Sequence, residues 1–366
     1  MFELAIKKED LLTPLLTVAG AVDKKQSLAI LSNFLLNVSQ GSLSITATDL
    51  EIEISAKVAC DANSNGSITV PAKKFIDIIR SLDENSSPKI VCDNGVLTIK
   101  HGRSSFKLTT LPAENYPLSD DECNDVEINI PRLVLLQLLQ STHFAMSQQD
   151  VRVFLNGLFL EFEPNVISAV ATDGHRMAIS RYSCENSGQN KLLLPKKGVQ
   201  ELLRLLNSVD DENVLLAAGK SHFKLITTQF IFLSKLIEAR FPPYAKAIPR
   251  DQDKQIVIDC AAFKRSIARI VILAHEKSKA VMLHLQDQQV TLIANNNEQE
   301  EAVETLAAET QGEELKIGLN ASYLLDVLNY FGDGQIRLSL SNTDSSILIE
   351  SLQNEAYQYI IMPMKI

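Results

Sequence analysis

The chain has 366 residues, of which 45% are apolar and 22% charged, and its formal net charge is −10. This length and composition predict two or three globular domains, while the acidic balance disfavours an ordinary nucleic-acid-binding domain. The five cysteines include no Cys-x-x-Cys pair, which argues against a disulfide framework or a zinc site and fits a reducing cytoplasm. No apolar run approaches the roughly 20 residues of a membrane-spanning helix, and the N-terminus lacks a signal-peptide pattern, so we expect a soluble cytoplasmic protein.

Two landmarks recur in the same order along the chain, with a period of about a third of its length. The first is a strand-like stretch that ends in a polar turn, and its copies are Ser44–Asp49, Val170–Asp173 and, more faintly, Leu292–Asn296. The second is an apolar-periodic helix, whose copies are Lys73–Arg80, Lys196–Arg204 and Tyr323–Tyr330. This period is longer than that of solenoid repeats and leaves room for a core in each unit. We therefore predict three similar domains, over residues 1–120, 121–243 and 244–366.

The coarse pattern within each third is helix, paired strands, helix, paired strands. The first helix of each domain is expected at Asp10–Val18, Pro131–Gln140 and Ala261–Val271, and Pro131 suits the first turn of its helix. Short stretches of period-two alternation predict strands, for example at 1–6, 43–47, 96–100, 223–228 and 336–340. Two helices and several antiparallel strands per unit place the chain in the α+β class.

Charged residues are unevenly distributed over the three predicted domains. The third domain holds 11 Lys and Arg against 17 Asp and Glu, and so carries most of the negative charge. In the other two domains a pair of lysines stands at the N-terminal end of the second helix, at Lys73, Lys74, Lys196 and Lys197. Because cations at that end oppose the helix dipole, these lysines are candidates for binding an external anion. The alternative is an ordinary solvated helix face.

Several short motifs carry a family resemblance, namely Ala171–Arg176, Asp150–Arg152 ahead of Asn156-Gly157, Phe241-Pro242 with Tyr244, Tyr323–Leu328 and Met362–Met364. In these motifs, and along essentially its whole length, the chain resembles the bacterial sliding clamps, the beta subunits of DNA polymerase III. The resemblance implies that two chains close head to tail into a ring of six domains, with helices inside and sheets outside. It also implies a non-catalytic processivity factor that encircles duplex DNA and tethers the polymerase without reading the sequence.

A ring that slides should hold phosphates weakly, through scattered basic side chains and without contacts to base edges. The resemblance implies DNA contacts at Lys25 and Gln149, and Arg103, Lys196 and Lys197 are plausible additions. Lys25 stands where the family example has arginine, so that position lacks the bidentate geometry of a guanidinium.

Opposite charges at the two ends of the chain suit a head-to-tail contact that closes into a ring. The stretch Glu298–Glu304 is acidic, whereas the first domain offers basic residues, including Arg103 and Lys107; the alternative for the acidic stretch is a solvated loop. The resemblance adds an apolar joint between edge strands. The predicted interface comprises Lys73, Lys74, Phe106, Leu108, Ile272, Leu273, Glu298, Glu300, Glu301 and Glu304.

The resemblance also implies a groove between the second and third domains that binds short peptides. Its predicted residues are Arg152, Leu155, Thr172, Gly174, His175, Arg176, Met177, Pro242, Lys246, Asn320, Tyr323, Asp344, Ile360, Met362, Pro363 and Met364. Methionine and aliphatic side chains repack at little cost, which suits many ligands. The expected partners are the catalytic subunit of DNA polymerase III, the clamp loader, other polymerases and repair proteins. Lys246 replaces an arginine and Asp344 a valine of the family example, so the polarity of the rim differs.

Two other classes of function compete with a clamp. Asp173, His175 and Arg176 lie close enough in sequence to suggest acid–base chemistry or a metal site. However, the other histidines form no ligand cluster, and the chain has no nucleophile elbow, phosphate-binding glycine loop or His-Glu-x-x-His motif. We therefore expect no catalytic residue, metal or cofactor. The second alternative is a scaffold that never encircles DNA, against which the basic helices and the resemblance speak.

Overall fold

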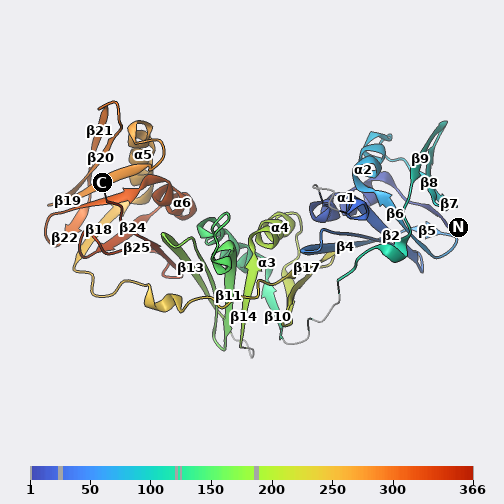
Figure 1. Ribbon diagram of the computed structural model, residues 1–366, viewed down its shortest axis with the longest axis horizontal. Coiled ribbons are helices and arrows are strands. Elements are labelled where there is room, and N and C mark those ends of the chain that lie inside the picture. Colours follow the sequence, from blue (N-terminus) through green and yellow to red (C-terminus); the bar gives the residue numbers. More distant parts are fainter. Residues whose placement is uncertain (1, 24–27, 120–122, 124–125, 185–188, 366) are drawn as a thin grey trace. The chain divides into compact units, whose positions relative to one another are not determined.

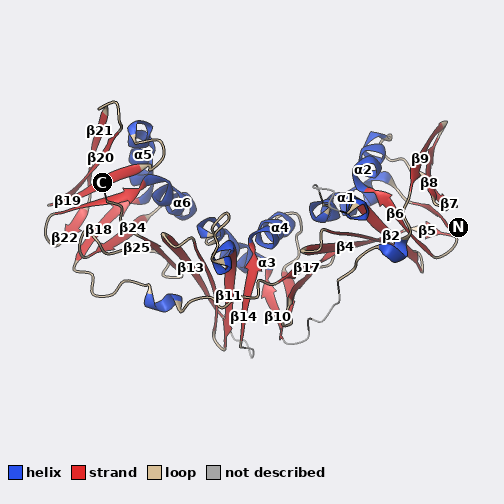
Figure 2. Ribbon diagram, viewed as in Figure 1, coloured by secondary structure: helices blue, strands red, loops and turns tan. Residues whose placement is uncertain are grey.

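The computed structural model describes residues 2–23, 28–119, 123, 126–184 and 189–365 (Figures 1 and 2). The chain divides into two compact units, one made of Met1–Leu133 and Lys197–Leu236, the other of Val134–Lys196 and Ile237–Ile366. All described strand pairs in both units are antiparallel.

The first unit contains two sheets and the helices α1 (Lys8–Val18) and α2 (Ala72–Ser81), which pack on each other and on strands of the larger sheet. The five-stranded sheet has the order β5 (Asp61–Ala62), β1 (Phe2–Ala5), β7 (Lys89–Asp93), β8 (Val96–His101) and β9 (Ser104–Thr109). The eight-stranded sheet has the order β10 (Val126–Pro131), β15 (Asn213–Ala218), β16 (His222–Ile226), β17 (Phe230–Lys235), β4 (Ile52–Ala59), β3 (Ser42–Thr48), β2 (Asn33–Ser39) and β6 (Gly66–Pro71). Nearly all of α4 (Lys196–Leu206) also belongs to this unit.

The second unit likewise contains two sheets, together with α5 (Cys260–Ile270) and α6 (Ala321–Phe331), which pack on each other, and most of α3 (Arg132–Gln140). The nine-stranded sheet has the order β14 (Asn190–Pro195), β11 (Gly157–Glu163), β12 (Val166–Thr172), β13 (Arg176–Ser183), β26 (Tyr357–Ile361), β25 (Ile347–Ser351), β24 (Gln335–Leu340), β18 (Lys254–Asp259) and β22 (Glu309–Gln311). The four-stranded sheet has the order β21 (Glu301–Ala307), β20 (Gln289–Asn295), β19 (Ala280–Gln286) and β23 (Leu315–Asn320).

Short 3₁₀ helices complete the described elements. In the first unit they are η1 (Ala19–Ala21), η2 (Ala29–Ser32) and η3 (Ala113–Asn115); in the second they are η4 (His143–Ala145), η5 (Val153–Asn156), η6 (Tyr244–Lys246) and η7 (Val271–Leu273).

Each of the two larger sheets contains strands from two of the predicted domains. In the first unit β17 pairs with β4, and Phe232 stands opposite Ile54. In the second unit β13 pairs with β26, and Met177 stands opposite Ile360. The central third of the chain thus lends strands to both units, which is why the compact units do not coincide with the three sequence repeats.

Helix positions follow from apolar spacing and capping. In α2 the buried residues are Ala72, Phe75 and Ile79, a spacing that places them on one face of a 3.6-residue helix. At the start of α5 the Asp259 carboxylate accepts a hydrogen bond from the Ala262 amide at 2.7 Å, and Asn320 caps α6 in the same way. The α+β prediction of two helices and antiparallel strands per domain is confirmed at this level.

The predicted helix ends are correct to within one or two residues, but two details of the sequence interpretation were wrong. Pro131 does not lie in the first turn of α3; it is the last residue of β10, an edge strand, where a missing amide hydrogen is tolerated. The strand expected to reach Thr228 ends at Ile226. There the Thr227 hydroxyl accepts a hydrogen bond from the Phe230 amide, and this bond closes a turn. Among the described residues, no helix has the length and apolarity needed to cross a bilayer.

The connection that leaves the first repeat is anchored by one buried tyrosine. The Tyr116 hydroxyl donates to the Asn33 carbonyl at 3.1 Å and accepts from the Thr48 amide at 3.2 Å. Burial of this side chain raises the pKa of its hydroxyl. Tyr116 thereby connects β2 and β3 to the chain segment that follows the five-stranded sheet.

We expect Tyr116→Phe to lower the unfolding free energy of the first unit by about 1–3 kcal/mol, because two buried backbone groups lose a partner. Denaturant unfolding followed by circular dichroism measures this change. The matched control is Tyr182→Phe on β13, a half-exposed tyrosine whose hydroxyl has no recorded partner among the described residues. Equal unfolding midpoints for the two variants would contradict the assignment.

Candidate functional site

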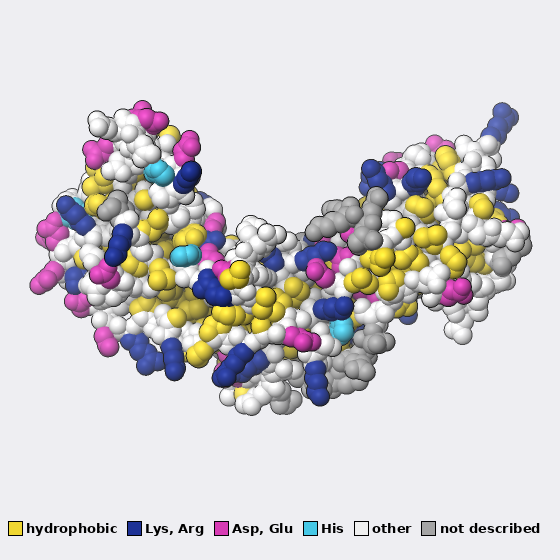
Figure 3. All heavy atoms as spheres, in the orientation of Figure 1, with side chains coloured by type: hydrophobic (Ala, Val, Ile, Leu, Met, Phe, Trp, Pro, Cys, Tyr) yellow, Lys and Arg dark blue, Asp and Glu magenta, His cyan; other side chains and the backbone are white. Residues whose placement is uncertain are grey.

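A pocket of about 320 Å³ lies in the second unit, beside the ladder between β13 and β26. Its walls come from η5 and the residues before it, the β12–β13 turn, the segment 241–247 and the end of β26. Figure 3 shows hydrophobic side chains gathered over the part of this unit that contains β13, with basic side chains nearby.

The floor of the pocket is a cluster of aromatic and aliphatic side chains. Phe241 stacks on Phe159, with ring centroids 4.7 Å apart and an interplanar angle of 3°. Phe154 meets Phe241 edge-on, and Met177 and Ile360, which are cross-strand partners, belong to the same cluster. Stacked and edge-on aromatic pairs of this kind contribute beyond their buried area, so the floor is well defined before any ligand arrives.

Tyr244, the first residue of η6, also lines the pocket. Its hydroxyl donates to the Glu161 carboxylate at 2.8 Å, and burial raises the pKa of Tyr244 to about 12. Lys191 pairs with the other oxygen of the same carboxylate at 2.8 Å. The 241–247 segment is therefore attached to β11 by a polar contact as well as by aromatic stacking.

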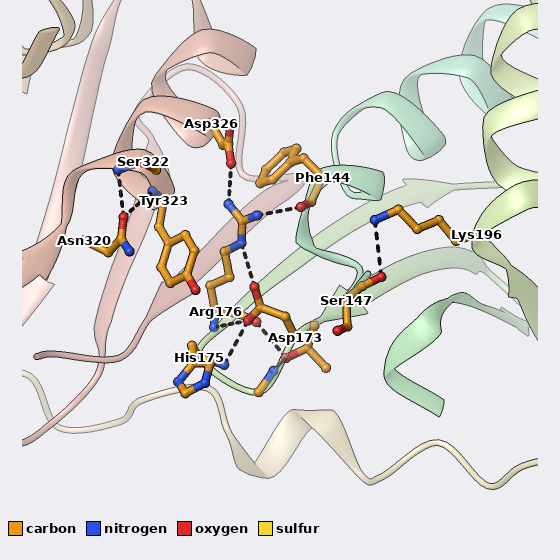
Figure 4. Close-up of polar contacts among 12 residues, drawn as sticks. Phe144, Ser147, Asp173, His175, Arg176, Lys196, Asn320, Ser322, Tyr323 and Asp326 are labelled. Atoms are coloured by element: carbon orange, nitrogen blue, oxygen red, sulfur yellow. Dashed lines mark hydrogen bonds and ion pairs between the residues drawn. The ribbon is translucent and has the colours of Figure 1, made fainter. Parts of the chain in front are cut away.

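The β12–β13 turn is built by side chain to backbone hydrogen bonds (Figure 4). The Thr172 hydroxyl donates to the Arg176 carbonyl at 2.6 Å and accepts from the Gly174 amide at 3.1 Å. One Asp173 carboxylate oxygen accepts from the amides of His175 and Arg176, at 2.9 and 3.0 Å. Gly174 has a φ of +88°, which glycine adopts without steric cost.

The same bonds recur in the first repeat. The Thr48 hydroxyl donates to the Ile52 carbonyl, and Asp49 accepts from the amides of Glu51 and Ile52. The residue that corresponds to Gly174 is Leu50, which also has a positive φ of +74°. The Thr-Asp landmark of the sequence is thus a specific turn that the chain uses twice.

Arg176 is held on all sides by its own unit (Figure 4). Its Nε donates to Asp173 at 3.1 Å, its Nη1 pairs with Asp326 on α6, and its Nη2 donates to the Phe144 carbonyl at 2.6 Å. The Tyr323 ring lies 4.3 Å from the guanidinium carbon, within cation–π range. Because the guanidinium is so fully engaged, Arg176 positions the turn rather than offering a free charge to a ligand.

Arg152 lies over the turn from the other side. Its side chain donates to both carboxylate oxygens of Asp150, at 3.0 and 2.9 Å. These hydrogen bonds, with a further one from the Arg152 amide, lower the pKa of Asp150 to about 2. A Cβ at Gly174 would lie 3.0 Å from the Arg152 guanidinium. Val151 and Val153, on either side of Arg152, are exposed to 97% and 52%.

The structure brings ten of the sixteen predicted groove residues into the lining of this pocket: Arg152, Leu155, Thr172, Gly174, His175, Arg176, Met177, Pro242, Ile360 and Met362. The other six lie outside the lining. Asn320 caps α6, Tyr323 packs on Arg176, and the Met364 amide donates to the Gly318 carbonyl at 2.8 Å. Asp344 is exposed in a turn organised by Asn342, Pro363 is half-buried, and Lys246 lines a neighbouring hollow.

Six lining residues were missed by the sequence prediction of the site: Phe154, Phe241, Pro243, Tyr244, Ala247 and Ser346. The available signal was the aromatic pair Phe241 and Tyr244 in a proline-rich connection. Aromatic residues beside prolines in a linker need a surface on which to pack, and here that surface is the pocket floor. Ser346 had no comparable signal, because its position depends on the pairing of β25.

The predicted DNA-contacting residues have different surroundings. Gln149 and Arg103 are exposed, whereas Lys25 lies outside the described residues. Lys196 donates to the Ser147 carbonyl at 3.2 Å, and burial followed by the charge of Arg176 lowers its pKa. Lys197 forms an ion pair with the buried Asp49 carboxylate. These two lysines therefore have partners inside the chain, which the reasoning from the helix dipole did not foresee.

Four of the predicted interface residues lie on strands at the edge of a sheet. Phe106 and Leu108 are on β9, at one end of the five-stranded sheet, and Glu301 and Glu304 are on β21, at one end of the four-stranded sheet. Lys73, Lys74, Glu298 and Glu300 are exposed, Ile272 is 78% exposed and Leu273 is half-buried. Glu304 differs, because Arg269 and the Ser266 hydroxyl already bind its carboxylate.

Comparisons with known proteins place this architecture in a family. Models of the N-terminal, central and C-terminal domains of the DNA polymerase III beta subunit match residues 2–120, 129–243 and 245–365. The chain belongs to the DNA polymerase III beta subunit family. It is 40% identical over 363 residues to the beta sliding clamp of Proteus mirabilis and 39% identical over 366 residues to that of Haemophilus influenzae, covering 99% and 100% of each chain.

Solved structures give the same relationship. A crystal structure of the DNA polymerase III beta subunit from Pseudomonas aeruginosa, 39% identical, superimposes with a TM-score of 0.96 over 100% of both chains. A sliding clamp of that organism bound to griselimycin superimposes with a TM-score of 0.95 at 40% identity. The predictions of three clamp domains and of a non-catalytic DNA sliding clamp that supports polymerase processivity are confirmed.

We expect Asp173→Ala to release the β12–β13 turn, because two amides and Arg176 lose their acceptor, at a cost of about 1–3 kcal/mol in unfolding free energy. Amide hydrogen exchange should accelerate by about tenfold or more over Thr172–Met177. The matched control is Asp49→Ala, which removes the equivalent acceptor in the first repeat and should accelerate exchange there instead. Unchanged exchange in Thr172–Met177 would show that Asp173 does not hold the turn.

Proposed function

We propose that two copies of this chain join head to tail into a closed ring that encircles duplex DNA. The observation that carries the proposal is the way in which domains join within the chain. The eight- and nine-stranded sheets each run from one sequence repeat into the next. The five- and four-stranded sheets instead end at β9 and β21, whose outer backbone groups have no strand partner among the described residues.

Pairing of β9 with β21 of a second copy would give a nine-stranded sheet like the one already present in the second unit. Unpaired edge strands are templates for strand addition, and a contact between two different surfaces closes into a ring when the rotation permits. The charges agree with this pairing, because Arg103 and Lys107 accompany β9 and Glu298, Glu300 and Glu301 accompany β21. The exposed Ile272 with Leu273 would supply the apolar contact to Phe106 and Leu108.

The proposed ring holds DNA through weak contacts to phosphates. The exposed Gln149 and Arg103 are available for this role in the structure, and we assign Lys25 to it by family resemblance. Lys196 and Lys197 would bind DNA only if they gave up their contacts with the Ser147 carbonyl and the Asp49 carboxylate in favour of phosphate oxygens. Few free cations suit a sliding contact, because each phosphate neutralised adds to affinity and to salt dependence.

The pocket beside β13 and β26 is the proposed binding site for short peptide segments of the polymerase, the clamp loader and repair proteins. An apolar, well-packed floor with a few polar groups at the rim is typical of ligand sites. Met362, 47% exposed, offers an adaptable wall. The griselimycin-bound clamp of Pseudomonas aeruginosa supports the proposal that a clamp of this family has a ligand pocket, and we assign that role to this one.

The domain limits and the location of the protein are part of the same proposal. The boundaries at residues 1–120, 121–243 and 244–366 are supported by the ranges of the three family matches. A clamp that acts on replicating bacterial DNA works in the cytoplasm.

Retention on circular DNA tests the function directly. After loading onto nicked circular duplex by a clamp loader, the protein should remain bound in salt that disrupts phosphate contacts, since topology rather than affinity retains it. Cutting the circle once should release it, which gel filtration of the labelled protein measures. Equal loss from circular and linear DNA would favour a scaffold that does not encircle DNA.

The joint is tested by Ile272→Ala combined with Leu273→Ala. These changes remove exposed apolar contacts without touching a domain core, so we expect folded monomers of 40.5 kDa where the unchanged protein sediments at about twice that mass. Leu352→Ala, at another exposed leucine of the same unit (43% exposed), is the control and should leave the dimer intact. A double variant that still sediments as a dimer would place the joint elsewhere.

A further inference from the structure

A second hollow adjoins the apolar pocket in the second unit. It has a volume of about 650 Å³, and Ala247 and Ser346 line both cavities. The two cavities are therefore neighbouring parts of one groove. Ala247 directly follows η6, and Ser346 directly precedes β25.

The lining of this hollow is basic and rich in hydroxyl groups. Lys246 and Arg250 are both exposed and form no ion pair within the described part of the chain. Ser341, Ser345 and Ser346 also line it, and no hydrogen bond of their hydroxyls is recorded among the described residues. Two free cations and three free hydroxyl groups on one concave surface can together bind an anion, because charge-assisted hydrogen bonds are the stronger kind.

The surrounding backbone holds these groups in place. The Asn342 side chain accepts from the amides of Asp344 and Ser345, both at 2.9 Å, and Gln252 donates to the Ser346 carbonyl at 3.3 Å. Two acids stand close in sequence: Asp344 beside Ser345, and Asp251 beside Arg250. Neither lines the hollow, so the groups that face a ligand there are basic or neutral.

We propose that this hollow binds acidic residues that flank the apolar anchor of a peptide bound in the adjoining pocket. This inference rests on the proposed function of that pocket. The two cavities are continuous, and their lining changes from apolar to basic. A peptide that fills both should therefore have an apolar segment followed or preceded by an acidic one. The hollow thereby adds specificity among peptides that share the same anchor, because an acidic flank gains contacts that a neutral flank lacks.

The test uses one polymerase-derived peptide that binds the apolar pocket, made in extended forms. Two aspartates or two asparagines are added at either end, and affinity for the full-length protein is measured by fluorescence anisotropy. At low salt, one aspartate form should bind about fivefold more tightly than its asparagine counterpart, as expected for exposed ion pairs worth up to about 1 kcal/mol each. The advantage should vanish near 1 M salt, where the screening length is about 3 Å.

Arg250→Gln should abolish the advantage of the aspartate form and leave binding of the unextended peptide unchanged. The matched control is Arg240→Gln, which removes the same charge from an exposed arginine in the same connection that lines neither cavity. This control should retain the advantage. If both variants lost the tighter binding of the aspartate form, the effect would come from net charge in general. The assignment of the acidic flank to the hollow would then be overturned.

Three further outcomes would overturn the inference in distinguishable ways. Equal affinities of the aspartate and asparagine forms would refute the acidic flank while leaving the peptide pocket intact. Failure of the unextended peptide to bind would refute the pocket and this inference with it. A single-stranded oligonucleotide whose binding falls in Arg250→Gln, while the aspartate peptides are unaffected, would assign the hollow to nucleic acid.

Discussion

The antiparallel ladder between β13 and β26 is the interaction on which the candidate site depends. Its backbone hydrogen bonds place Met177 opposite Ile360 and Arg176 opposite Ile361, although these residues are far apart in the chain. Strand spacing in a sheet is only about 4.7–4.9 Å, so the ladder brings both sides of the pocket floor within van der Waals reach. A register slip of one residue would turn Met177 to the other face of the sheet and remove one side of the floor.

The Arg176 side chain braces the same site from within. It connects the β12–β13 turn to α6 through Asp326 and to the chain before η5 through the Phe144 carbonyl. Both Asp173 and Arg176 are largely buried, with side chains 15% and 12% exposed. Breaking such a pair leaves an uncompensated charge in a poorly hydrated place. The turn can therefore present Thr172, Gly174 and His175 to a ligand in a fixed geometry.

The distribution of charge separates structural cations from available ones. Lys196 and Lys197 are the first two residues of α4, Arg176 is the first residue of β13, and all three have partners within the chain. Arg103, Lys246 and Arg250 are exposed and have no ion pair among the described residues. A net charge of −10 repels DNA and acidic peptides at long range, so local groups of free cations decide where an anion can bind.

The sequence by itself determined the repeats, the α+β class and the six α-helices of the described residues, because apolar periodicity and turn chemistry are local properties. The Thr-Asp turn is an example, since its hydrogen bonds join residues only two to four positions apart. Most of the groove residues could be named as well, but through family resemblance and not through local pattern. Ten of them line one pocket because the fold of this chain closely follows that of the family.

The tertiary structure alone decided which strands end a sheet, which cations are free and which residues share a cavity. β9 and β21 become edge strands only when every other strand has found its partner. Lys197 loses its freedom because it pairs with Asp49, which follows β3 and stands nearly 150 positions earlier in the chain. Arg176 is held by Asp326, which stands 150 positions later. The hollow around Arg250 depends on the pairing of β25 with its neighbours. Contacts of such sequence separation arise from packing of the whole chain, and no local pattern of residues encodes them.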